Sequence, residues 1–134
     1  MQAHLYVALV TLLAAATYFW MATCVARAHK KSGILAPAMT GDPVLERTIR
    51  AHTNTLEWMP IFLPSLWLFS IYWSPAVAAI LGLAWIVGRI MYFLGYIAGP
   101  EKRYPGFFIQ GAAAFALLLG AAGRIIYLAI AAAT

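Results

Sequence analysis

Long apolar runs dominate the chain and alternate with short segments that hold most of its charged residues. The runs cover about residues 5–25, 44–73, 76–97 and 104–132. Each is long enough for a helix of ~20 residues, the length that crosses a ~30 Å hydrocarbon core. The pattern therefore predicts an all-α integral membrane protein, a bundle of four transmembrane helices.

Proline and glycine mark the boundaries between these runs. Proline lacks an N–H and restricts the residue before it, so Ser74–Pro75 should end the second helix. The third should end at the sequence AGP, residues 98–100. No basic region precedes the first run, which we therefore interpret as a span rather than a cleavable signal. Four spans and their connections use nearly all 134 residues, so we predict one domain over residues 1–134.

Composition and charge agree with a membrane protein. The chain is 64% hydrophobic and 10% charged, whereas a soluble domain has about 25% charged residues. Its net charge is +5, and the basic residues lie mainly beside the first and third loops. Lys and Arg mark the cytoplasmic side, so these loops should face the cytoplasm; a nucleic-acid interface is a poor explanation. Cys24 is the only cysteine, which excludes an intramolecular disulfide, and no metal site is expected.

A polar stripe opens the second helix. Arg47, Arg50, Asn54 and Glu57 are three or four residues apart, a spacing that places them on one helix face. Ionisable groups at membrane depth face the bundle interior or an aqueous cavity. Two interpretations follow: a structural network that joins helices, or a site for a small ligand with both charge signs and a peptide backbone.

The third helix repeats this arrangement. Arg89, Tyr92 and Tyr96 again share a face, and Arg103 follows near the same end of the bundle. Each tyrosine alone could be an interfacial anchor. Two on one stripe, close to the basic end of the second helix, favour a binding site.

The segments ERTIRAHTNTLEWMP, from Glu46, and GRIMYFLGYIAGPEKR, from Gly88, resemble the two signature segments of the MAPEG family. These are the membrane-associated proteins in eicosanoid and glutathione metabolism. RAHTNTLE is especially similar to the microsomal glutathione transferase branch. The resemblance implies a left-handed four-helix bundle assembled as a homotrimer, with glutathione bound near the cytoplasmic side between neighbouring subunits.

The resemblance also implies roles for individual residues. Arg103 matches the arginine proposed to stabilise the glutathione thiolate, and is the expected catalytic residue. Arg27, with Lys30 as the alternative, matches a basic residue that contacts a glutathione carboxylate. His52 either touches the ligand or faces the interface. The remaining expected glutathione-binding residues are Arg50, Asn54, Glu57, Tyr92 and Tyr96, the two tyrosines from the adjacent subunit.

The implied activity is the conjugation of glutathione, as co-substrate, to a lipophilic electrophile that arrives from the membrane lipid, with glutathione-dependent peroxidase activity as a further option. The alternatives are a non-catalytic lipid-binding scaffold of the same family and, as a third class, a small channel or transporter. A bacterial inner membrane is the expected location, with the endoplasmic reticulum second. The roles of Arg89 and Arg124 stay open.

Overall fold

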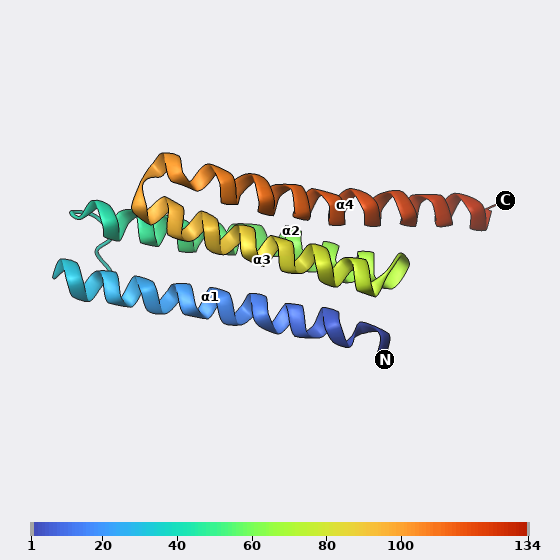
Figure 1. The fold of residues 1–134 in the computed structure, drawn as a ribbon, viewed down its shortest axis with the longest axis horizontal. Helices are drawn as coiled ribbons and strands as arrows, with labels where there is room; N and C mark the ends of the chain where they lie inside the picture. The colour runs from blue at the N-terminus through green and yellow to red at the C-terminus, as the bar shows by residue number, and fades with distance from the viewer. Residues whose placement is uncertain (1, 134) are drawn as a thin grey trace.

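Four long helices form an antiparallel bundle in the computed structural model, which describes residues 2–133 (Figure 1). The helices are α1 (Leu5–Ser32), α2 (Pro43–Tyr72), α3 (Pro75–Ala98) and α4 (Tyr104–Ala133), with short 3-10 helices η1 (Gln2–His4) and η2 (Pro100–Arg103). The α1–α2 and α3–α4 connections share one end of the bundle, the loop end, while the α2–α3 turn and both termini lie toward the other. The predicted all-α four-helix fold is confirmed.

Helix α1 continues past Val25, where the apolar run was expected to end the helix. The additional residues include Ala, Arg and Lys, which favour helix. Its last turn carries basic residues, which interact favourably with a helix C-terminus. Gly33 then stops the helix in the left-handed conformation, at φ 72°. The helix therefore extends beyond its apolar part because its end is well capped.

Helices α2 and α3 begin in the same way, with a side-chain N-cap followed by a proline. Asp42 and Ser74 are the N-cap residues, and their side chains accept hydrogen bonds from the backbone N–H groups of Leu45 and Val77. A proline follows each cap at the first helical position, where its missing N–H costs nothing. Ser74 and Pro75 thus separate the two helices, as the sequence indicated.

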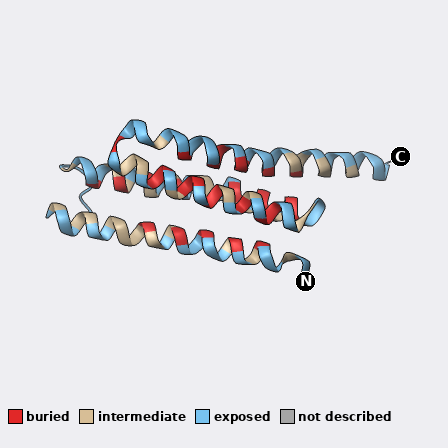
Figure 2. Cartoon of the chain, in the orientation of Figure 1, coloured by how far each residue is buried: buried red, intermediate tan, exposed pale blue. Residues whose placement is uncertain are grey.

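Three helical segments are long and apolar enough to cross a membrane: Leu5–Ser32, Pro75–Ala98 and Pro100–Ala133. Helix α2 is 30 residues long but is less apolar than these three segments, because its first half carries the polar stripe. The buried positions of α2 and α3 face the interior of the bundle (Figure 2), whereas much of α1 and α4 is exposed and apolar.

Close contact between α3 and α4 fixes the loop end of the bundle. A Cβ atom on Gly106 would collide with the backbone of Tyr92, and one on Gly88 would lie 2.5 Å from the backbone N of Gln110. Small residues allow helices to approach this closely in a membrane. A smaller buried cluster beside this contact includes Met21, Ala51, Tyr92 and Phe93, with Cys24 packed against it. Cys24 is thus a packing residue of α1, as expected.

Candidate functional site

The polar stripe of α2 forms a connected set of side chains. Arg50 Nη1 donates to Glu57 Oε1 at 2.9 Å, and Asn54 Nδ2 donates to Glu57 Oε2 at 2.9 Å. One carboxylate therefore binds both neighbours, one turn and two turns before it on the same face of the helix. The side chains of Arg50 and Glu57 are 52% and 49% exposed, so this part of the stripe is accessible from outside the chain.

Arg89 ties the stripe to α3. Its side chain is fully buried; Nη2 donates to Asn54 Oδ1 at 2.5 Å and Nε donates to Thr55 Oγ1 at 3.2 Å. Its guanidinium also lies 4.3 Å from the ring centre of Tyr92, a cation–π distance. Arg89 thus contacts interior groups of α2 and links the two helices.

The two interpretations of the stripe therefore apply to different ends of one network. The buried end, at Arg89, Asn54 and Thr55, is the structural link between helices. The half-exposed end is the ion pair of Arg50 and Glu57, which a ligand can approach from outside the chain. Because an exposed ion pair contributes little to stability, a ligand can separate these two charges at low cost.

The tyrosines of α3 lie next to this network. Tyr92 and Tyr96 have ring centres 5.8 Å apart; Tyr92 is buried, whereas Tyr96 lines a cavity of about 300 Å³ at the loop end. The cavity is bounded by Pro43, Glu46, Arg47, Arg50, Tyr96 and Pro100. A single chain therefore brings Arg47 and Arg50 of the α2 stripe and one tyrosine of α3 to one cavity.

Arg103 does not line this cavity but contacts Tyr96, which does. It ends η2, and its guanidinium lies 4.9 Å from the ring centre of Tyr96 and 5.1 Å from that of Tyr104. The two aromatic rings hold this cation at the loop end, close to the stripe of α2. Tyr104 belongs to neither polar stripe, so the sequence did not predict its contact with Arg103.

His52 belongs to another face of α2. It is two residues from Arg50, about 200° around a helix of 3.6 residues per turn, and its ring stacks on Tyr18 of α1 at 4.4 Å. Its Nε2 atom is buried with no hydrogen-bond partner among residues 2–133. His52 is therefore separate from the network of Arg50 and Glu57 within one chain.

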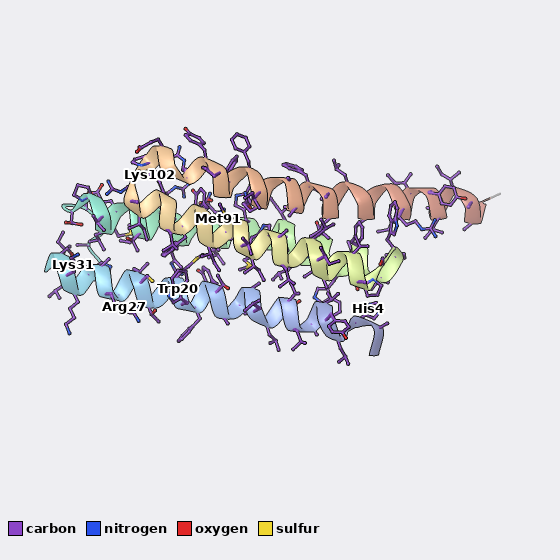
Figure 3. All side chains as sticks on the ribbon, in the orientation of Figure 1. His4, Trp20, Arg27, Lys31, Met91 and Lys102 are labelled. Carbon is purple, nitrogen blue, oxygen red and sulfur yellow. The ribbon has the colours of Figure 1, made fainter. Side chains whose placement is uncertain are left out.

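Among residues 2–133, the basic residues Arg27 and Lys30 at the end of α1 make no hydrogen bond or ion pair with the network. Arg27 and Lys30 are both exposed, and Arg27 lies on α1 near the loop end, as do Lys31 and, from η2, Lys102 (Figure 3). The choice between Arg27 and Lys30 as a ligand contact stays a prediction.

Nothing in the sequence indicated Thr55, and Arg47 was placed on the stripe without being included among the expected glutathione contacts. Thr55 accepts from Arg89, but an uncharged threonine in an apolar helix gives no recognisable signal. Arg47 lines the cavity and its Nε donates to the Ile97 carbonyl of α3 at 3.1 Å. Its place on the stripe, three residues before Arg50, was the available signal for that residue.

Comparison with known proteins identifies the family. Residues 7–123 match the family model described as MAPEG family. The chain is 44% identical over 123 residues to an uncharacterized protein from Synechocystis sp., covering 92% of this chain and 90% of that protein. It is 40% identical over 117 residues to microsomal glutathione S-transferase 2 from Homo sapiens, covering 87% of this chain and 80% of the relative.

A more distant relative has a different name. Leukotriene C4 synthase from Cavia porcellus is 33% identical over 111 residues, covering 83% of this chain and 74% of the relative. The matched segment contains the stripe of α2, the stripe of α3 and Arg103. The chain is an integral membrane protein and belongs to the MAPEG family.

Proposed function

We propose that the protein is a membrane-embedded glutathione transferase that conjugates the glutathione thiolate to lipophilic electrophiles. The observation that carries the proposal is the half-exposed Arg50–Glu57 pair, 2.9 Å apart, beside a cavity that Tyr96 also lines. Relatives named microsomal glutathione S-transferase 2 cover most of the chain, which supports the choice of ligand.

Glutathione suits the charges of the network. Arg50 offers a planar donor pair to a carboxylate, and Glu57 accepts from the ligand's ammonium. Binding exchanges one ion pair inside the protein for two between protein and ligand. Asn54 already donates to Glu57 and accepts from Arg89, yet its amide keeps one N–H and one lone pair for a peptide group of the ligand.

The chemistry depends on the charge of the ligand's sulfur. A thiol with a pKa of ~8.5 is mostly protonated at neutral pH, and only the thiolate is a good nucleophile. We assign Arg103 the role of stabilising that anion, since a guanidinium stays charged throughout the physiological range. The thiol proton passes to water, the thiolate forms a bond to the electrophilic carbon, and the displaced electron pair remains on the leaving group or on the product anion.

The second substrate reaches the site through the bilayer. Trp58 of α2 lies near two partly or largely exposed rings of α4, with ring centres 6.2 Å from Phe107 and 6.4 Å from Phe115. Phe107 in turn lies 6.4 Å from Tyr92. These aromatic side chains form a surface between α2 and α4 that runs from the lipid-facing side to the tyrosines. This surface supports the proposal that the second substrate is an apolar electrophile.

A second copy of the chain should complete the site. Arg50 and Glu57 are half exposed in a single chain, and charged groups on a membrane helix face water or a polar neighbour rather than acyl chains. A homotrimer provides such a neighbour if Tyr96 of one copy serves the stripe of the next. Tyr92, expected to do the same, is buried against Arg89 of its own chain. Arg27 or Lys30 would add a contact to a ligand carboxylate, and His52 would face that interface.

Purified protein in detergent tests the function directly. Mixing it with glutathione should produce thiolate absorbance, and adding a model electrophile should give conjugate at a rate that saturates with glutathione. A hydroperoxide in place of the electrophile tests peroxidase activity. Glutathione binding without turnover would instead support the lipid-binding scaffold, and ion flux in liposomes without glutathione binding would support a channel.

A further inference from the structure

Arg124 is the one basic residue of the chain that follows Arg103 in the sequence. It lies on α4, and its Nε donates to the backbone carbonyl of Tyr72, the last residue of α2, at 3.3 Å. Its guanidinium also lies 5.6 Å from the ring centre of Tyr127. Arg124 is therefore at the α2–α3 turn, at the opposite end of the bundle from the candidate site (Figure 1).

No acidic side chain balances this charge. The four acidic residues are Asp42, Glu46, Glu57 and Glu101, all of them in or near the loop-end half of the bundle. A cation within a membrane segment normally pairs with another group. The bond to Tyr72 uses one of the five N–H donors of the guanidinium, and a carbonyl carries no net charge. Among the side chains that the structure describes, Arg124 therefore has no anionic partner, and an anion from outside the chain can pair with it.

A cavity adjoins the guanidinium. It measures about 530 Å³ and is lined by Trp73, Leu119, Gly120, Gly123, Arg124 and Tyr127. Two of these residues have no side chain, and a Cβ atom on Gly123 would meet no atom within 4 Å. The rings of Trp73 and Tyr127 are 58% and 62% exposed; such aromatic residues gather at the headgroup level of a bilayer.

We propose that this cavity binds the headgroup phosphate of an anionic phospholipid, in the leaflet opposite the α1–α2 and α3–α4 connections. The guanidinium provides charge-assisted donors to the phosphate oxygens, and Trp73 and Tyr127 flank the headgroup. Leu119, which is 66% exposed, offers an apolar wall to the acyl chain. That wall favours a lipid over free phosphate, which has no apolar part to bury.

Lipid binding to the purified protein tests the site. Native mass spectrometry would compare phosphatidylglycerol with phosphatidylcholine at equal concentration, for the wild type and for Arg124→Gln. The wild type should prefer phosphatidylglycerol, and Arg124→Gln should lose about fivefold in that affinity, the worth of one cation near an anionic lipid surface. Lys31→Gln removes one positive charge at the opposite end (Figure 3) and should keep the preference.

Two further variants separate charge from shape. Arg124→Lys should retain part of the preference, because it keeps the cation without the guanidinium fork. Gly123→Leu adds a side chain to the cavity at a position where a Cβ atom meets nothing within 4 Å, so the variant should fold normally and lose bound lipid. Equal phosphatidylglycerol affinity in the wild type and in Arg124→Gln would overturn the proposal. Displacement of the lipid by millimolar inorganic phosphate would also overturn it, since the site would then bind a free anion.

Discussion

Arg89 of α3 and Asn54 of α2 are joined by a hydrogen bond of 2.5 Å between the guanidinium Nη2 and the amide Oδ1. Asn54 in turn donates to Glu57, so a buried cation on one helix orients an exposed anion on the next. The geometry of the half-exposed pair of Arg50 and Glu57 therefore depends on how α2 packs on α3.

Replacing Arg89 should weaken both the fold and the ligand site. In Arg89→Met, Asn54 and Thr55 lose their donor in a buried position, which costs about 1–3 kcal/mol of unfolding free energy. Glutathione affinity should fall as well, since Asn54 no longer has a fixed orientation. Denaturant titration in detergent and equilibrium binding would measure the two effects; unchanged glutathione binding would show that Arg89 has only a structural role.

Glu57→Gln should affect binding much more than stability. The carboxylate is half exposed, and exposed ion pairs add little to the free energy of unfolding, so the thermal midpoint should hardly move. Glutathione affinity should drop because the ligand's ammonium loses its charged partner. Raising the salt concentration should weaken binding to the wild type more than to the variant, because salt screens exposed charges.

Arg50→Ala should act mainly on glutathione affinity. A hydrogen bond to a charged group contributes about 1.5–3 kcal/mol, so the dissociation constant should rise about ten- to a hundredfold. The glutathione dissociation constants of Arg27→Ala and Lys30→Ala should be measured in the same assay. The variant with the larger increase identifies the residue at the end of α1 that contacts a ligand carboxylate. The turnover of enzyme saturated with glutathione should stay close to that of the wild type in Arg50→Ala.

Arg103→Ala should act mainly on turnover. Without the guanidinium, the pKa of the bound thiol should rise toward ~8.5, so less thiolate is present at neutral pH. The turnover–pH profile should therefore move to higher pH, with activity partly recovered in alkaline buffer. A lower rate with no change in the pH profile would contradict this assignment, and Arg103→Lys should retain part of the thiolate absorbance.

Gly106→Leu should disrupt the contact between α3 and α4. A side chain there collides with the backbone of Tyr92, and overpacking of this kind costs about 3 kcal/mol. The matched control is Gly123→Leu on the same helix, where a Cβ atom meets open space. Thermal unfolding in detergent should separate the two variants clearly; similar midpoints would mean that α4 can shift without loss.

Helical periodicity was sufficient to predict most of the polar stripe of α2, because side chains three or four residues apart share a helix face. Arg50, Asn54 and Glu57 were grouped on that ground, and the structure joins them through one carboxylate. The same rule, applied to His52, places it on a different face from Arg50, where it stacks on Tyr18. Its assignment to the ligand came from the family resemblance and not from helix geometry.

The four helices and their boundaries at Ser74 and Gly99 could be predicted from the amino-acid sequence, because the length of an apolar run and the effect of proline are local properties. The residues that share a stripe could be predicted as well. Three contacts could not be predicted: Arg89 bonds to Asn54 and Thr55, Arg103 lies over the ring of Tyr96, and Arg124 reaches the end of α2. These contacts join different helices, and their partners depend on helix rotation and on the close approach that Gly88 and Gly106 permit.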